Sequence, residues 1–285
     1  MNKKKIYSNT FLLPTLVIFS LFFLIPLIIS LYFSLTVWDF QSFRFVGLDN
    51  FKMFFSERSL NIGIRNTLIY ALLTSGLKVT VGFFLAVFLT SGIRSKNLLR
   101  TILFFPNLVS TIAVGITFSA LLHPTKGLVN QFLETMGFDK IDFLGNISTA
   151  LYAVIGTDVW KGVGVATVIY IAGVQAIDKT YYEAAAIDGA SKWQLIRHIT
   201  FPFVRPAMNS VIMLSFISGM RFFDLIWSMT GGGPGFATDV MSSIVYKQYA
   251  AGFYGLSTAG NVIMFVMIGL IAFPLQRFLL KKGEE

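Results

Sequence analysis

Apolar residues in this chain run in long stretches that are interrupted by short polar segments. A helix that spans a membrane needs roughly 20 apolar residues, and six stretches are long enough. They are residues 11–37, 67–91, 101–123, 149–177, 204–229 and 256–280. Lys3, Lys4 and Lys5 precede the first stretch, as in a secretory signal, but its apolar run exceeds a signal core of roughly 7–15 residues and no small-residue cleavage site closes it. We therefore interpret it as a retained span.

The composition agrees with this pattern. The chain has 285 residues, of which 55% are hydrophobic and 13% are charged, and its mean hydropathy is +0.70. Soluble domains carry about a quarter charged residues, so we predict an all-α polytopic membrane protein with six transmembrane helices. Cysteine is absent, which excludes disulfides and thiolate metal sites.

The polar segments carry different charge on the two sides of the membrane. With the N-terminus in the cytoplasm, that side has thirteen cations and five acids, whereas the other side has seven of each. The cytoplasmic cations are Lys3, Lys4, Lys5, Arg94, Lys96, Arg100, Lys179, Lys192, Arg197, Arg205, Arg277, Lys281 and Lys282. Lys and Arg accumulate in cytoplasmic loops, so we predict a multi-pass protein of the cytoplasmic (inner) membrane with both termini inside. The net charge of +9 then reflects topology, and we expect no nucleic-acid partner.

One cytoplasmic segment, YYEAAAIDGASKWQLIRHITFP (181–202), reads like soluble protein. Thr180-Tyr-Tyr-Glu183 and Ser191-Lys-Trp-Gln194 both fit the pattern of a capping box at a helix start. Gly189 stands where a helix ends in left-handed geometry, and Pro202 is expected to end the second helix. The segment therefore predicts two short helices around a glycine corner.

The first short helix has a face of very small side chains, formed by Ala184, Ala185, Ala186 and Ala190. Small residues let another surface approach the backbone closely, which favours docking of a protein. The alternative is a helix lying on the lipid surface with Lys192 and Arg197 among the headgroups, although such a helix usually buries bulkier apolar residues.

The segment resembles the EAA loop of the membrane subunits of ABC importers. The matching residues are Glu183, Ala184, Ala185, Gly189, Ile199 and Pro202, with Phe201 where the family usually has leucine. Other stretches resemble the maltose-type and multiple-sugar-type permeases: GLDNF (47–51), NTLIYALL (66–73), RTILFFPNLVS (100–110), IAGVQAID (171–178), FFDLIWSMTGGGPGFAT (222–238) and GLSTA (255–259).

The resemblance implies the transmembrane domain of a type I ABC importer for a sugar or oligosaccharide. Residues 1–65 would form the cytoplasmic tail, first helix and outer loop, and residues 66–280 a five-helix domain that contains the coupling loop at 181–202. The implied partners are a second permease subunit in a heterodimer, two ATPase subunits that bind ATP and Mg²⁺, an extracellular sugar-binding protein and membrane lipid. The chain itself would bind no cofactor, and Glu183, Ala184, Ala185, Gly189 and Ala190 would contact the ATPase.

Five charged residues fall within the predicted spans, where a charge costs roughly 2.5 kcal/mol or more. Lys78 and Asp158 are at similar depth, so we expect them to pair across two helices. Asp158 with Lys161 and Arg221 with Asp224 are each three residues apart and can partly neutralise one another. For Lys78, Asp158 and Lys161 a structural role is at least as probable as contact with substrate.

The outer end of the fifth span offers a candidate substrate path, because sugars bind beside aromatic rings and charged groups. Arg221 and Asp224 flank Phe222 and Phe223 there, and we expect loss of Asp224 to impair uptake more than loss of Lys161. An aromatic belt with a surface salt bridge is an equal alternative. Further polar candidates are Asn107, Ser110 and Asn261.

No catalytic constellation is visible in the sequence. Gly231-Gly-Gly-Pro-Gly235 lacks the lysine and hydroxyl of a phosphate-binding loop, and the only histidines, His123 and His198, are predicted on opposite sides of the membrane. We predict a transport subunit without a metal site. The alternatives are a self-sufficient secondary transporter or channel, an importer for a non-sugar solute such as a polyol or glycerophosphate, or a membrane scaffold.

The predicted topology is tested by a single cysteine in place of Lys192, since the chain has none of its own. We expect a membrane-impermeant thiol reagent to leave this cysteine unlabelled in intact cells. Labelling before the cells are opened would contradict a cytoplasmic location of the loop.

Overall fold

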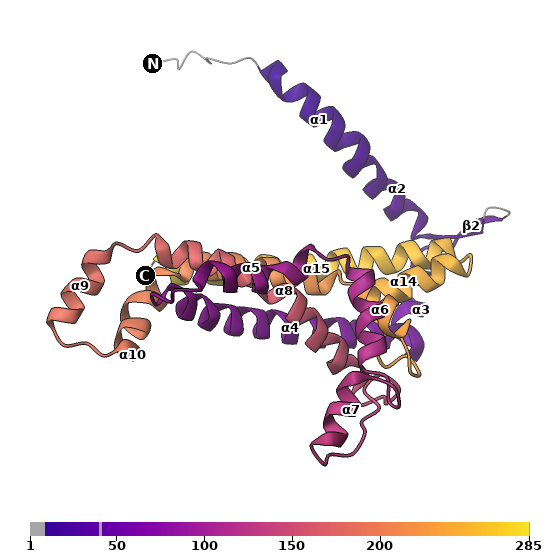
Figure 1. Ribbon diagram of the computed structural model, residues 1–285. Helices are drawn as coiled ribbons and strands as arrows, with labels where there is room; N and C mark the ends of the chain where they lie inside the picture. Colours follow the sequence, from indigo (N-terminus) through magenta and orange to yellow (C-terminus); the bar gives the residue numbers. More distant parts are fainter. Residues whose placement is uncertain (1–8, 40–41, 285) are drawn as a thin grey trace, which may run out of the picture.

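The computed structural model describes residues 9–39 and 42–284, which form a mostly helical protein (Figure 1). Four helices are long and apolar enough to span a membrane: Thr10–Phe33, Arg58–Thr90, Ala150–Gln175 and Tyr254–Lys281. Two bent helix pairs bring the number of candidate spans to as many as six within the described residues. The predicted cations Lys3, Lys4 and Lys5 and the acid Glu285 lie outside these residues.

The first span is a nearly continuous helix made of η1 (Asn9–Leu12), α1 (Leu13–Phe19), η2 (Ser20–Leu24) and α2 (Ile25–Phe33). It ends earlier than the predicted position 37, because Thr36–Trp38 (β1) pairs antiparallel with Phe43–Phe45 (β2). These short segments are rich in β-branched and aromatic residues, which favour strands. The expected all-α fold therefore holds for the membrane part, and a two-stranded sheet is added outside it.

After the sheet, α3 (Asp49–Ser56) leads into α4 (Arg58–Thr90). The buried Asn50 of α3 donates hydrogen bonds to the carbonyl oxygens of Ser34 (2.9 Å) and Thr36 (2.8 Å), and so joins α3 to the end of the first span. Helix α4 runs unbroken through the proposed boundary between residues 65 and 66. The division of the chain at that point stays a proposal.

The third predicted span is bent in the middle. Helix α5 (Lys96–Leu108) and helix α6 (Thr111–Leu121) meet at an angle of 98°. Pro106 lies in the last turn of α5, where it removes a backbone donor and weakens the continuation of the helix. The stretch 101–123 is therefore not one straight helix.

The fifth predicted span is divided as well. Helix α12 (Arg205–Met220) ends before Arg221, and α13 (Asp224–Thr230) follows as a separate short helix that packs against α6. The prediction of one helix over 204–229 is wrong for this reason. Apolar content alone does not distinguish a single span from two helices that are both buried.

The core is formed by α4, α12 and α8 (Ala150–Gln175). Glycines let these helices approach closely: a Cβ atom on Gly82 of α4 would lie 2.9 Å from Ala166 Cβ of α8, and one on Gly219 of α12 would lie 2.8 Å from Ala71 Cα of α4. Small residues at helix contacts are typical of membrane bundles, where dispersion forces replace the hydrophobic effect. These contacts fix the three helices around the polar groups described below.

The remaining helices belong to the two ends and one side of the bundle. Helix α7 (Leu128–Thr135) projects at one end, α14 (Met241–Ala250) packs against α15 (Tyr254–Glu284), and the hairpin of α9 (Lys179–Ile187) and α10 (Lys192–Leu195) projects at the other end, where the C-terminus also lies (Figure 1). We call the end with α9 and α10 the loop end and the end with α7 the opposite end.

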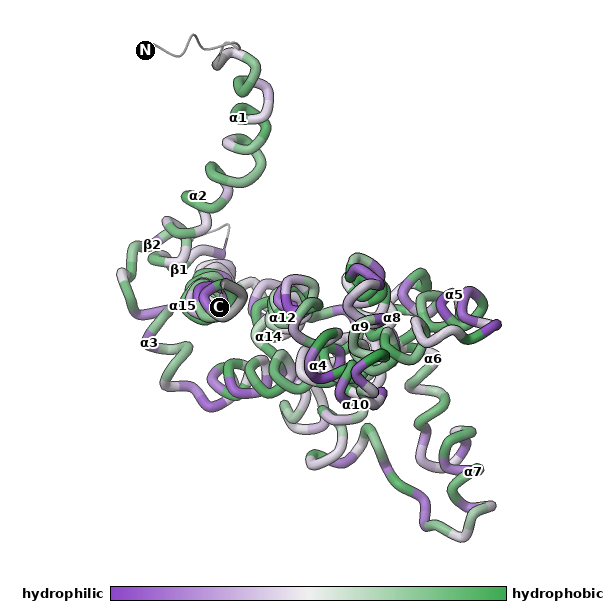
Figure 2. The backbone as a smooth tube through the Cα atoms, turned by 90° about the vertical axis from the view of Figure 1, so that its left-hand side faces the viewer, coloured by the Kyte–Doolittle hydropathy of each residue, from purple (hydrophilic) through white to green (hydrophobic). Residues whose placement is uncertain are grey.

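The arrangement of the ends agrees with the charge pattern. The segments predicted to be cytoplasmic between spans two and three and between spans four and five meet at the loop end, where Lys96, Lys179 and Lys192 line one pocket. The side of the membrane that the loop end faces stays a prediction. The first span points away from the bundle, and it is apolar and unburied along its length (Figure 2).

Candidate functional site

The loop between α8 and α12 begins with a capped helix, although the cap differs from the predicted one. The carboxylate of Asp178 accepts a hydrogen bond from the backbone amide of Thr180 (2.9 Å), so Asp178 is the N-cap of α9 and Thr180 lies inside the helix. Aspartate is among the best N-cap residues. This hydrogen bond holds the pKa of Asp178 below its usual value.

Gly189 ends α9 as predicted. Its φ of +76° lies in the left-handed region, and the amides of Gly189 and Ala190 donate to the carbonyls of Ala186 (3.1 Å) and Ala185 (2.9 Å). These are the bonds by which a glycine satisfies the last carbonyls of a helix. A Cβ atom added to Gly189 would meet no heavy atom within 4 Å, so the space beside it is open.

The second capping box is confirmed. The amide of Ser191 donates to Oε1 of Gln194 (2.7 Å), and the amide of Gln194 donates to Oγ of Ser191 (3.4 Å). The helix continues from α10 through a π-helical turn, η3 (Ile196–Thr200), into α11 (Phe201–Phe203). Pro202 therefore stands inside the helical run and does not end it; the run ends after Phe203, where α12 departs at 69°.

The two arms of the loop are tied together at their base, while the face of α9 is uncovered. The hydroxyl groups of Tyr182 and Thr200 are 3.0 Å apart, and the rings of Tyr181 and Phe203 are in contact with centroids 4.7 Å apart. No residue of α9 is buried. Glu183 and Ala184 are exposed, Ala185, Gly189 and Ala190 lie on the same uncovered hairpin, and Ile187 is 87% exposed. The hairpin is thus a stiff projection whose apolar tip lacks a covering surface.

A polar cavity of about 310 Å³ lies among the spanning helices. On its wall the ammonium group of Lys78 (α4) donates to the carboxylate of Asp158 (α8) at 2.7 Å, and both side chains are almost completely buried. This confirms the predicted pair. Lys161 lies one turn further along α8 and donates to the carbonyl oxygen of Asn107 (3.3 Å) at the end of α5, not to Asp158.

The structure divides the predicted substrate-path residues into two groups. Asn107 and Phe222 line the polar cavity together with Lys78, Asp158 and Lys161. The others are elsewhere: Ser110, Phe223, Asp224 and Asn261 are absent from its lining, and Arg221 and Asn261 belong to an apolar groove between the first span, α12 and α15. Among the ion pairs of the described residues, none joins Arg221 to Asp224.

Sequence reasoning missed two serines and a threonine of the cavity. Ser215 and Ser218 lie on α12 and Thr111 begins α6. The two serines share a face of α12 with Val211, at intervals of three, four and seven residues, and Phe222 follows in the break after this helix. That spacing is a signal in the sequence, but it is not informative until the partner helices are known.

A second polar cluster braces the opposite end. Asp239 is fully buried and binds Lys247 through both carboxylate oxygens (2.9 and 2.7 Å) and Ser243 (2.8 Å). Asn66 at this end of α4 donates to the carbonyls of Ala237 (3.0 Å) and Asp239 (2.9 Å). The glycine-rich segment at 231–235 is therefore part of a structural turn. Among the described residues, no group of three or more His, Cys, Asp or Glu side chains is placed to hold a metal ion.

Comparison with known proteins identifies this architecture. Residues 78–282 match the family described as binding-protein-dependent transport system inner membrane component. The chain belongs to this family. It is the permease of an ABC importer in the sugar-transport branch, it is not itself catalytic, and the family implies a partner ATPase and a multi-pass location in the inner membrane.

Individual relatives cover nearly the whole chain. The permease is 32% identical to the trehalose/maltose transport system permease protein of Thermococcus litoralis, over 90% of this chain and 88% of that protein. It is 31% identical to the multiple sugar-binding transport system permease protein of Streptococcus mutans, over 98% and 97%. The permease is also similar to one chain of a bacterial alginate ABC transporter, which was solved in complex with an alginate pentasaccharide-bound periplasmic protein. The TM-score is 0.83 and the sequence identity is 25%, and the match covers 93% of this chain and 91% of the transporter chain.

The buried pair between α4 and α8 gives a stability prediction. Replacing Lys78 by Met leaves the Asp158 carboxylate buried without its partner, which costs about 3–5 kcal/mol when one member of such a pair is removed. We expect a clear fall in the thermal unfolding temperature of the purified permease.

The matched control is the double variant Lys78→Met/Asp158→Leu, which removes both charges and should recover most of the loss. Lys161→Met should have a smaller effect because its hydrogen bond is to a carbonyl group. Equal stability of the single and double variants would contradict the proposed role of the pair.

Proposed function

We propose that this permease forms one half of the pore of an ATP-driven sugar importer, and that sugar passes along the polar cavity while a separate ATPase moves the cavity walls through the loop at 181–202. The observation that carries this proposal is the way the chain connects the loop to the cavity. The loop joins α8 and α12 directly, and both helices line the cavity. A displacement of the loop therefore acts on two cavity walls at once.

The loop is suited to transmit force because its base is braced. The contacts of Tyr182 with Thr200 and of Tyr181 with Phe203 keep the arms together, and capped helix ends resist fraying. The ATPase would grip the open face around Glu183, Ala184, Ala185, Gly189 and Ala190. ATP and Mg²⁺ belong to the ATPase, whose nucleotide-driven closure would bias the bundle between two rigid-body states.

Two uncovered surfaces support an assembly. No residue of the first span from Thr10 to Phe33 is buried, and the neighbouring apolar groove between this span, α12 and α15 measures about 880 Å³. A second permease subunit, in a heterodimer, and membrane lipid would cover them. An extracellular sugar-binding protein would deliver substrate to the opposite end, as the periplasmic protein in the alginate transporter complex suggests.

The chemistry of the cavity suits a sugar. Its lining supplies charged groups from Lys78, Asp158 and Lys161 and hydroxyl groups from Ser215 and Ser218. Phe222 adds an aromatic ring, and the combination of hydroxyl partners with a flat apolar face is typical of carbohydrate sites. A polyol or glycerophosphate shares part of this chemistry and is the alternative substrate class. A self-sufficient secondary transporter works without an ATPase, so it would not need the projecting loop as a docking surface.

The cavity assignment reverses the expectation that Asp224 matters more than Lys161. We expect Lys161→Met to reduce sugar uptake by about tenfold or more, because a hydrogen bond to a charged group contributes about 1.5–3 kcal/mol. Asp224→Asn should leave uptake near the wild-type value, because Asp224 is exposed and outside the cavity. The two variants are compared by the uptake of labelled sugar in cells with equal amounts of inserted permease. A larger loss in Asp224→Asn than in Lys161→Met would instead place the substrate site at the outer end of the fifth predicted span.

Bulk at Gly189 tests the coupling role of the loop. A side chain there costs on the order of 1 kcal/mol in backbone strain, and it projects into the open space where the ATPase would sit. We expect Gly189→Leu to insert normally but to weaken co-purification of the ATPase and to reduce sugar uptake, with Gly189→Ala intermediate.

Gly137 provides the control, since its φ of +82° and its open surroundings match those of Gly189 but it lies at the opposite end, after α7. Gly137→Leu should keep the ATPase bound. Wild-type uptake and ATPase association in Gly189→Leu would show that the loop is not the coupling element.

A further inference from the structure

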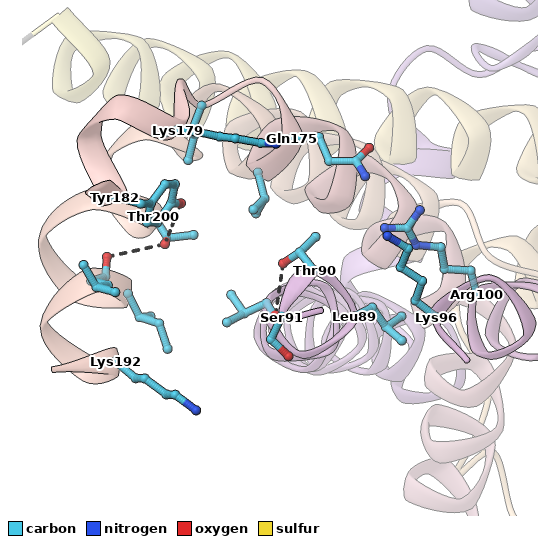
Figure 3. Close-up of a pocket in the computed structure, with 15 residues that line it drawn as sticks. Leu89, Thr90, Ser91, Lys96, Arg100, Gln175, Lys179, Tyr182, Lys192 and Thr200 are labelled. Carbon is cyan, nitrogen blue, oxygen red and sulfur yellow. Dashed lines mark hydrogen bonds between the residues drawn. The ribbon is translucent and has the colours of Figure 1, made fainter. Parts of the chain in front are cut away.

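A second pocket of about 480 Å³ lies at the loop end, bounded by the end of α4, the start of α5, the end of α8 and the α9–α10 hairpin (Figure 3). Its lining contains four cations and no acidic side chain: Lys96, Arg100, Lys179 and Lys192. The rest of the wall is largely apolar and includes Val87, Leu89, Val174, Ile177, Leu195 and Ile196. The pocket therefore combines positive charge with a hydrophobic surface.

The cations of this pocket lack acidic partners within the described part of the chain. The Nε atom of Arg100 is buried and has no hydrogen-bond partner there. In Figure 3, the side chains of Lys96 and Arg100 come from one side of the pocket, and Lys179 extends toward Gln175 on another side. A buried donor without a partner costs about 1–3 kcal/mol, and an acceptor at Arg100 would recover this energy. The neighbouring cations favour an acceptor that is anionic.

The depth of the pocket selects the kind of anion. The residues that line it lie where the spanning helices end or begin: α4 ends at Thr90, α5 begins at Lys96 and α8 ends at Gln175. Lipid headgroups lie at this level, and basic pockets between transmembrane helices on the cytoplasmic side bind anionic headgroups. A soluble phosphate offers the same charge but makes no use of the apolar wall.

We propose that this pocket binds one anionic phospholipid, with the phosphate between Lys96, Arg100 and Lys179 and the acyl chains along the apolar wall. Because the pocket is lined by both the α9–α10 hairpin and the ends of α4 and α5, a bound lipid would bridge the loop to the bundle. The location in the cytoplasmic leaflet and an effect on coupling rest on the proposed function, whereas the lipid binding itself does not.

Native mass spectrometry of the delipidated full-length permease tests the site. Phosphatidylglycerol and phosphatidylcholine with identical acyl chains are titrated separately, and inorganic phosphate is titrated in a third arm. We expect one tightly held phosphatidylglycerol. In Lys96→Gln/Arg100→Gln its affinity should fall roughly 30-fold, because each cation near the headgroups contributes about a fivefold factor.

The matched control is Lys126→Gln/Lys140→Gln, which removes two exposed cations near α7 at the opposite end and should leave the affinity unchanged. Arg100→Lys keeps the charge but loses the planar donor group, so it should retain most of the binding in a folded protein. The same titration is repeated on the permease assembled with its ATPase.

Four outcomes would overturn the proposal. They are equal binding of the two lipids, undiminished binding in Lys96→Gln/Arg100→Gln, saturation by inorganic phosphate in place of lipid, and loss of the bound lipid when the ATPase is added. The last would show that acidic groups of the ATPase fill the pocket. A failure of sugar uptake or coupling leaves the lipid result unaffected, so the two proposals fail separately.

Discussion

The ion pair between Lys78 and Asp158 is the interaction around which the bundle is arranged. It joins α4 to α8 with both side chains buried, at a depth where either charge alone would be expensive. Such a pair rarely stabilises a protein more than apolar residues of the same size would. Its position gives it a second role, since both of its side chains line the polar cavity together with Lys161 and Asn107.

The polar cavity and the projecting loop are connected through the same two helices, which is the basis of the proposed coupling. Helix α8 carries Asp158 and Lys161 and runs into the loop through the cap at Asp178, and the chain returns through α11 into α12. Close contact at Gly82 and Gly219 leaves little room for α4 to slide against its neighbours. On the proposed function, movement at the loop would therefore tilt or shift whole helices.

Much of this organisation could be predicted from the sequence, because the determining signals are local. The six apolar stretches, the glycine corner at Gly189, the capping box at Ser191 and the pairing of Lys78 with Asp158 all follow from composition, spacing or depth. The bend after α5 has a local signal in Pro106, but the break after α12 could not be predicted, since an apolar stretch is compatible with a straight span or with two packed helices. The predicted cap of α9 at Thr180 is wrong because Asp178 and Thr180 both suit an N-cap. Only the position of the last turn of α8 decides between them, in favour of Asp178.

The break between α5 and α6 explains why Lys161 belongs to the polar cavity. A helix that ends within the membrane leaves its last carbonyl groups without helical partners, and irregular backbone at that depth is tolerated only where it faces protein or a polar cavity. Lys161 donates to one of these carbonyls, that of Asn107. This hydrogen bond satisfies both groups. The carbonyl oxygen of Asn107, left free by the bend, gives the buried ammonium group of Lys161 an acceptor, and Lys161 gives that carbonyl oxygen a donor. If the proposed sugar path is correct, a substrate hydroxyl in the cavity would compete for these same two groups, so the contact would serve both the fold and substrate binding.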